Sequence, residues 1–197
     1  VAGFLSEANG PTHQAIEDVS IMRGIPNINV FCPADIQDFN IGIKKVLQHE
    51  NPFYIRYLNL PNIVEHNEFE IGKSEVFGNG NDIAILVYGM LFNQAYQAKE
   101  ILEKKGYSVR LLNLRTLKPI DESEILKAVK QCKLIVTLED HFITGGLFSI
   151  LAEILLKNKI TADVLPLALM NKWFKPALLN DILEYEGFTF NQIAIRI

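Results

Sequence analysis

A histidine in a short loop is the first candidate for chemistry in this chain. His13 lies in the run Gly10-Pro11-Thr12-His13-Gln14, and imidazole is the side chain that gives or takes a proton near neutral pH. Proline ahead of a helix fixes the entry dihedral angle, Thr12 can cap a free amide, and the amides of a first turn attract negative charge. The run therefore predicts that His13 lies at the start of a helix and faces a substrate oxygen. The alternative is a histidine that only hydrogen-bonds its own loop.

Arg56 is the second candidate, because it is a permanent charge in the otherwise apolar and aromatic run Phe53-Tyr54-Ile55-Arg56-Tyr57. A guanidinium in such a strand needs an anionic partner to offset its desolvation. That partner is either a carboxylate, which makes Arg56 a member of a salt bridge, or a phosphomonoester, which a planar guanidinium binds well. The residues alone leave both alternatives open.

The elements that position these residues follow from hydrophobic periodicity and turn residues. The first part predicts a helix that stops by Gly24, a strand over 29–32, a helix that starts at Pro33-Ala34-Asp35 and a strand over 53–57. The stretch 59–81 has no clear period, so it is interpreted as a linker. Beyond it, strands and helices alternate, which predicts an open, mostly parallel sheet with helices on both faces. The expected strands are 83–88, 109–114, 134–138 and 164–169, and the expected helices are 91–105, 121–130, one from 144–146 and a last one near 176–185.

Composition excludes several classes of function. The chain has 197 residues, a net charge of −4 and no lysine-rich block, which argues against a nucleic-acid footprint. It has neither a long uncharged apolar stretch nor a signal-peptide pattern, so we expect a cytoplasmic protein away from membranes. Cys32 and Cys132 are expected to be buried, reduced thiols. Because the chain starts at Val1 in mid-pattern, we expect it to come from a larger protein.

Several motifs resemble the transketolase family of thiamine-diphosphate enzymes. The run Gly10 to Gln14 resembles the family's Gly-Pro-Thr-His-Gln loop, Pro33-Ala34-Asp35 its Pro-Ala-Asp, and 53–57 the strand that delivers a phosphate-binding arginine. The run Val136 to His141, followed by Gly145-Gly146-Leu147, resembles the signature of the family's C-terminal domain. The resemblance implies an α/β fold: residues 1–65 are the remainder of a pyrimidine-binding α/β domain, 66–80 a linker, and 81–197 an open, mostly parallel α/β C-terminal domain.

The same resemblance implies a function for the complete enzyme. Transketolases move a two-carbon ketol unit between sugar phosphates in the pentose phosphate part of carbohydrate metabolism, with thiamine diphosphate and magnesium as cofactors. His13 would be the catalytic and substrate-binding histidine that orients or protonates sugar oxygens, and Arg56 would bind the terminal phosphate. Asn9 stands where the family usually has an aspartate that reads a hydroxyl, although an asparagine before glycine is also a common turn residue.

The resemblance also indicates what this chain lacks. The glutamate and the aromatic residues that activate the cofactor lie upstream of Val1 in the family, and the diphosphate-binding domain with its metal motif is missing. We therefore expect no cofactor-binding or metal-binding residue in this chain, and an inactive fragment when it is alone. The family's active sites lie between subunits, so we expect a homodimer and leave open a separate N-terminal subunit.

Three alternatives stay open. A 1-deoxyxylulose-5-phosphate synthase shares the loop but usually has a second histidine where this chain has Gln14. The β subunits of 2-oxoacid dehydrogenases are more distant, because they lack the Pro-Thr-His-Gln run. A noncatalytic dimerisation or regulatory module is the alternative outside enzymes. We expect His141 to be structural and see no site neighbours for His49 or His66.

Overall fold

A five-stranded sheet forms the centre of the molecule in the computed structural model, which describes residues 2–197. Val1, on which the expectation of an upstream segment rests, lies outside the described residues. The strand order is β3-β5-β4-β7-β8; the last four strands in this order are parallel and β3 is antiparallel to β5. This is the open, mostly parallel sheet that the sequence predicts. The strands are β3 (Glu75–Phe77), β4 (Ile83–Val87), β5 (Val109–Asn113), β7 (Leu134–Phe142) and β8 (Val164–Leu169).

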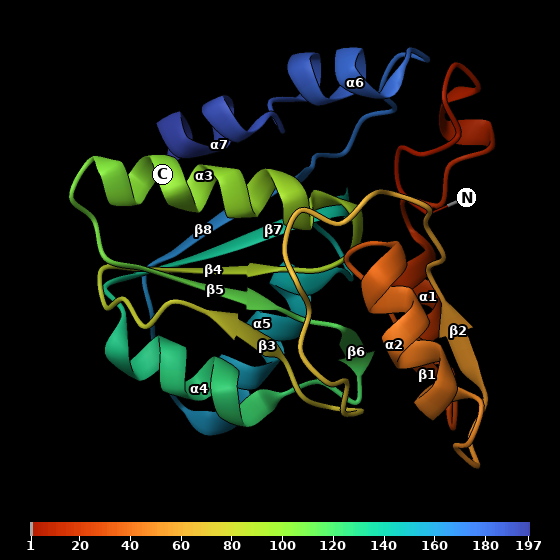
Figure 1. The fold of residues 1–197 in the computed structure, drawn as a ribbon, viewed down its shortest axis with the longest axis horizontal. Coiled ribbons are helices and arrows are strands. Elements are labelled where there is room, and N and C mark those ends of the chain that lie inside the picture. The colour runs from red at the N-terminus through yellow and green to blue at the C-terminus, as the bar shows by residue number, and fades with distance from the viewer. Residues whose placement is uncertain (1) are drawn as a thin grey trace.

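Helices cover both faces of this sheet, as Figure 1 shows. On β4, Ile83, Ile85 and Val87 pack into a core with α3 and the C-terminal helices. Ala84 and Leu86 point the other way and pack with α4 and α5. This alternation buries both faces of a parallel strand, so the strand is a continuous apolar run. The helices are α3 (Phe92–Lys104), which follows the 3₁₀ turn η2 (Gly89–Leu91), α4 (Glu122–Gln131), α5 (Leu147–Asn158), α6 (Leu179–Glu186) and α7 (Phe190–Arg196).

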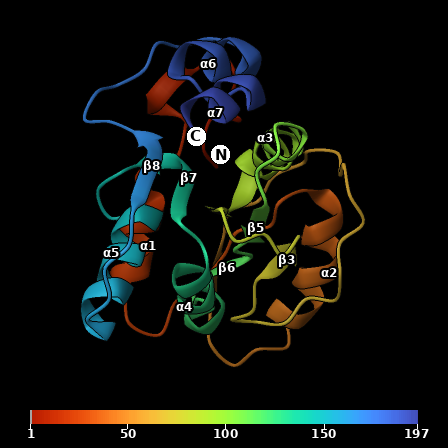
Figure 2. The same ribbon diagram turned by 90° about the vertical axis from the view of Figure 1, so that its left-hand side faces the viewer.

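A smaller three-stranded sheet, in the order β2-β1-β6, lies beside the first. It is formed by β1 (Asn29–Phe31), β2 (Phe53–Ile55) and β6 (Thr116–Lys118), with α1 (Asp18–Gly24) and α2 (Ile36–Val46) between or before the strands. Strand β6 comes from the second half of the chain and pairs antiparallel with β1. The two halves of the chain therefore share a sheet. Figure 2 shows α2 on one side of the molecule and α1 with α5 on the other.

Short elements account for most differences from the sequence prediction. Strand β3 lies inside the stretch expected to be a linker, and β6 and α7 were not predicted. Strands β3 and β6 lack the apolar run that makes the equally short β1 and β2 recognisable, and their partners lie far away in the sequence. Cys132 is half-buried rather than buried, and both cysteines are free thiols.

Candidate functional site

His13 ends a single 3₁₀ turn, η1 (Gly10–Thr12), and does not begin an α-helix. Helix α1 starts five residues later, at Asp18. The hydroxyl of Thr12 donates to the carbonyl of Asn9 at 3.3 Å and lies 2.9 Å from Nδ1 of His13, so it caps no helix. The predicted helix start at His13 is therefore wrong. The cause is local: Pro11 and Thr12 favour a tight turn, which the chain leaves before α1.

The loop that carries His13 is closed by a buried side chain. Nε2 of Gln14 donates to the carbonyls of Phe4 and Ser6 at 2.9 and 3.1 Å, and Gln14 is only 3% exposed. His13 and Asn9 are both exposed on this loop. Nδ2 of Asn9 donates to Oγ of Ser6 at 3.0 Å and to the carbonyl of Glu7 at 3.3 Å. The loop therefore presents an imidazole and an amide oxygen on a base held by internal hydrogen bonds.

Arg56 follows β2 and is buried, with 2% of its surface exposed. Its Nε donates to Oδ2 of Asp18 and one terminal nitrogen donates to Oδ1 of Asp140, both at 2.8 Å. The other terminal nitrogen donates to the carbonyl of Ala15 at 2.9 Å. The guanidinium also lies over the ring of Tyr88, 5.3 Å from its centroid. The structure thus gives Arg56 carboxylate partners. Phosphate binding by Arg56 stays a prediction, and it requires the phosphate to displace one of these carboxylates.

Glu139 and His141, on either side of Asp140, are also buried. Glu139 accepts hydrogen bonds from the amides of Leu147 and Phe148 at the start of α5, at 2.6 and 3.0 Å. Burial nevertheless raises the pKa of Glu139 to about 8. Burial lowers the pKa of His141, whose Nε2 accepts from the amide of Ser20 at 3.3 Å. Both ring nitrogens of His141 face protein atoms, in agreement with the structural role that we expected.

A second cluster of charges surrounds His66, for which the sequence indicated no neighbours. Its ring nitrogens lie 2.7 Å from Oδ2 of Asp35 and 2.7 Å from Oε2 of Glu75, and its side chain is fully buried. Arg115 pairs with Asp38 and Glu75, each at 2.9 Å. The two carboxylates raise the pKa of His66 to about 9, against the opposing effect of burial. The sequence shows no site neighbours for His66, because its two carboxylate partners come from segments that only the fold brings together.

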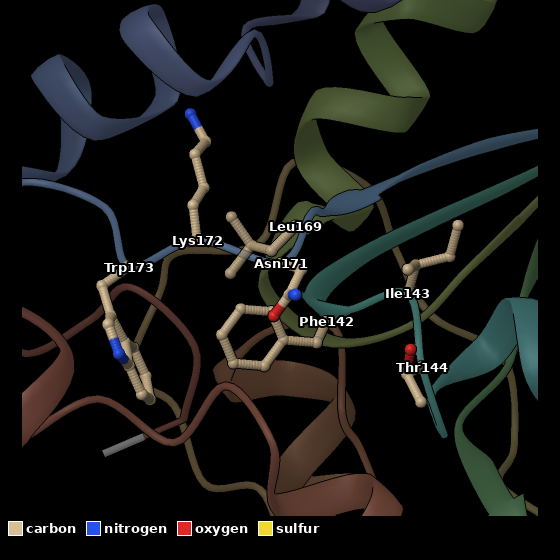
Figure 3. Close-up of a pocket in the computed structure, with 7 residues that line it drawn as sticks. All are labelled: Phe142, Ile143, Thr144, Leu169, Asn171, Lys172 and Trp173. Carbon is tan, nitrogen blue, oxygen red and sulfur yellow. The ribbon is translucent and has the colours of Figure 1, made fainter.

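A hollow with a volume of about 510 Å³ lies where β7 and β8 end (Figure 3). The ring of Trp173 borders it, 5.6 Å from the ring centroid of Phe142. The segment that carries Trp173 also touches the His13 loop, since the amide of Ala8 donates to the carbonyl of Ala177 at 2.9 Å. The lining residues are Phe142, Ile143, Thr144, Leu169, Asn171, Lys172 and Trp173.

Within residues 2–197, no three His, Cys, Asp or Glu side chains are arranged to hold a metal ion. None of the helices in the same range has the length and apolarity to cross a bilayer.

Two known domain families match this chain. The model of the transketolase C-terminal domain matches residues 72–193, and the model of the transketolase pyrimidine-binding domain matches residues 2–59. The chain belongs to the transketolase family. It corresponds to the C-terminal part of these proteins, a family that generally depends on thiamine diphosphate.

The chain spans between about a third and two thirds of the length of the curated relatives described here. It is 34% identical, over 100% of its length, to 63% of a protein of Methanocaldococcus jannaschii named as a transketolase C-terminal section. It is 38% identical, over 79% of its length, to 49% of a 6-deoxy-6-sulfo-D-fructose transketolase subunit of Clostridium sp.. A 1-deoxy-D-xylulose-5-phosphate synthase of Dictyoglomus thermophilum is 33% identical over the whole chain, which spans 32% of that enzyme.

Solved structures agree with this family. A split-gene transketolase described as an inactive β4 tetramer superposes with a TM-score of 0.81 at 31% identity, covering 94% of this chain and 60% of the other. The transketolase of Pichia stipitis in complex with sedoheptulose 7-phosphate gives a TM-score of 0.72 at 23% identity, covering 96% and 27%. The second likeness supports the fold alone.

Proposed function

We propose that this chain is the C-terminal part of a thiamine-diphosphate-dependent enzyme that transfers a two-carbon ketol unit between sugar phosphates. In this proposal, residues 1–65 complete a pyrimidine-binding domain, 66–80 link it to the rest, and 81–197 are the C-terminal domain. The observation that carries it is the loop on which His13 and Asn9 are both exposed above a base closed by Gln14. Membership in the transketolase family supports the type of reaction. The exposed side chains of the loop support His13 and Asn9 as the residues that meet the sugar.

The exposed side chains suit a sugar. The imidazole of His13 can donate to, or accept from, a sugar oxygen, which makes it the proposed catalytic and substrate-binding residue. The amide oxygen of Asn9 can accept a hydrogen bond from a substrate hydroxyl. Arg56 is the proposed phosphate ligand, on condition that the phosphate displaces Asp18 from the guanidinium, because the Asp18 side chain is 9% exposed and that of Asp140 is fully buried. When bound, thiamine diphosphate supplies the electron sink for breaking the carbon–carbon bond beside a ketone.

Partners are proposed on the same basis. Two relatives are described as a transketolase subunit and as a tetramer of a split-gene transketolase. Near the loop that follows β8, Trp173, Leu178 and Tyr185 have 66%, 55% and 42% of their surfaces exposed. Large apolar side chains exposed together favour a surface that a partner subunit covers. We propose that the active form is a homodimer or an assembly with a separate N-terminal subunit, that this chain alone is inactive, and that the enzyme works in the cytoplasm in pentose phosphate metabolism.

The test is an assay of the assembled enzyme with thiamine diphosphate and magnesium. Fructose 6-phosphate serves as donor and an aldose phosphate as acceptor, with His13→Ala as the variant. Loss of an oriented acid–base group is expected to lower kcat/KM by about 10²- to 10⁴-fold. The matched control is His49→Ala, an exposed histidine beyond the end of α2. Equal kcat/KM for wild type and His13→Ala would overturn the proposed role.

A 1-deoxyxylulose-5-phosphate synthase is the second candidate, because such an enzyme is 33% identical over the whole chain. Its donor would be pyruvate, so the same assay with pyruvate and an aldehyde phosphate separates the two: release of carbon dioxide favours the synthase. A noncatalytic module would give no binding heat with thiamine diphosphate and magnesium in calorimetry of the assembled protein.

A further inference from the structure

The carboxylate of Asp140 is connected to the His13 loop through two hydrogen bonds in series. Asp140 lies on β7, its side chain is fully buried, and its Oδ1 accepts from Arg56 at 2.8 Å. Arg56 in turn donates to the carbonyl of Ala15 at 2.9 Å. Ala15 is two residues from His13, and the residue between them, Gln14, is buried.

The guanidinium transmits orientation because it is planar and rigid. Asp18 and Asp140 fix two of its nitrogens, so the position of the third, which meets the Ala15 carbonyl, is determined. The ring of Tyr88 lies against one face of the guanidinium, 5.3 Å from ring centroid to the central carbon. A loss of charge at Asp140 would free one edge of the guanidinium and let the group turn toward Asp18.

The base of the loop has further anchors at the same point. The amide of Gly3 donates to the Ala15 carbonyl at 3.0 Å, and the amide of Phe142 donates to the carbonyl of Ile16 at 2.9 Å. A Cβ atom at Gly3 would lie 1.6 Å from Oδ2 of Asp140, so only glycine leaves room for this carboxylate. The loop base, the end of β7 and the guanidinium therefore form one packed unit.

The geometry points to Asp140 as a positioning residue: through Arg56 and the Ala15 carbonyl, it sets the position of His13 without touching the substrate. The inference rests on the proposed function for the substrate that His13 meets. In this inference, strand β7 of the central sheet contributes to substrate binding through the buried ion pair between Asp140 and Arg56. It also predicts that Asp140 affects unphosphorylated as well as phosphorylated sugars, because its effect on His13 passes through the loop and needs no phosphate.

The test compares Asp140→Asn with Asp38→Asn. Asp140→Asn keeps the shape of the side chain, and Asp18 still balances the charge of Arg56, so the variant is expected to fold. Asp38 is a matched control, because it is equally buried, pairs with Arg115 at 2.9 Å, and Glu75 still balances that arginine after the substitution.

Histidine NMR spectra of the full chain give a readout that needs no catalysis, since the chain has four histidines. Asp140→Asn is expected to shift or broaden the signals of His13, and Asp38→Asn those of His66 alone. If Asp140→Asn unfolds, Arg56→Lys replaces it: it keeps a positive charge between the carboxylates but cannot hold all three partners, and it is expected to shift the His13 signals in the same way. Unchanged His13 signals would overturn the inference.

Kinetics of the assembled enzyme provide the second readout. Asp140→Asn is expected to lower kcat/KM both for fructose 6-phosphate and for fructose, roughly ten- to a hundredfold for fructose, while Asp38→Asn leaves both unchanged. A change confined to fructose 6-phosphate would overturn the inference, because Asp140 would then act on the phosphate site. If wild type turns over neither sugar, the proposed function fails, and the NMR comparison still decides the role of Asp140.

Discussion

Nδ1 of His66 lies 2.7 Å from Oε2 of Glu75, inside a protein interior where neither side chain meets solvent. Glu75 lies on β3 of the central sheet, and the other ring nitrogen of His66 faces Asp35, which caps α2 beside the smaller sheet. A protonated imidazole therefore holds the two sheets together through opposite charges. Buried ion pairs of this kind lose their stabilising effect when one partner loses its charge.

The first prediction concerns the pH dependence of this contact. The pKa of His66 is raised to about 9, so its contribution to stability is complete below pH about 6.5 and is lost as pH rises through about 9. Wild type should exceed His66→Gln in free energy of unfolding by the largest amount at pH 6, and the difference should shrink up to pH 9. Urea unfolding followed by circular dichroism at five pH values measures it, with His49→Gln as control. A difference that does not change with pH would contradict the ion pair.

Glu139 gives a second pH prediction with its own window. Burial raises its pKa from 4.5 to about 8, so the folded state retains a proton that the unfolded chain releases. Stability from Glu139 is present below pH about 4.5 and is lost as pH rises through about 8. Across that range, the free energy of unfolding of Glu139→Gln should rise relative to that of wild type, because the amide stays neutral. Glu122→Gln is the control, because hydrogen bonds from Asn158 and Lys157 lower the pKa of Glu122, which places any effect at more acidic pH.

The third prediction is the stability effect of Arg56. Arg56→Ala leaves Asp18 and Asp140 buried without a cation, which typically destabilises a protein by about 3–5 kcal/mol. Arg23→Ala is the matched control, because Arg23 pairs with Glu153, whose side chain is 64% exposed, and such pairs contribute about 0–1 kcal/mol. Chemical denaturation of both variants measures the two effects. Similar losses in the two variants would show that the Arg56 cluster is not a buried ion-pair network.

Much of the fold could be predicted from the sequence because its helices and longer strands carry their own periodicity. Strand β8 has the predicted bounds, and Asp121 caps α4 by accepting from the amide of Glu124 at 3.2 Å. Strands β3 and β6 could not be found, since neither has an apolar run of its own and each depends on a partner from another part of the chain. Local patterns determine elements, whereas pairing is a property of the whole fold.

The sequence could name candidate site residues but not their contacts. Residue types together with the family resemblance made His13 and Arg56 candidates, and their roles stay predictions. The partners of Arg56 are 38 and 84 residues away, so no spacing rule could show that two aspartates surround it. His66 was missed for the same reason, because a histidine in a segment without periodicity gives no sign of a carboxylate 31 residues before it. A charged residue next to apolar neighbours, as at Glu75 and Arg115, is the signal that could have indicated such a cluster.

The last prediction concerns Asn9 and sugar preference. A carboxylate accepts a hydroxyl hydrogen bond more strongly than an amide oxygen does, by roughly 1 kcal/mol. Asn9→Asp should therefore raise kcat/KM about fivefold for a ketose whose hydroxyl faces this position, and leave it unchanged for the isomer with that hydroxyl inverted. The substitution also removes the amide group that donates to Ser6 and Glu7. Asn9→Ala is the matched control, because it removes the same two hydrogen bonds without adding charge. If both variants change the two isomers alike, Asn9 acts only as a turn residue.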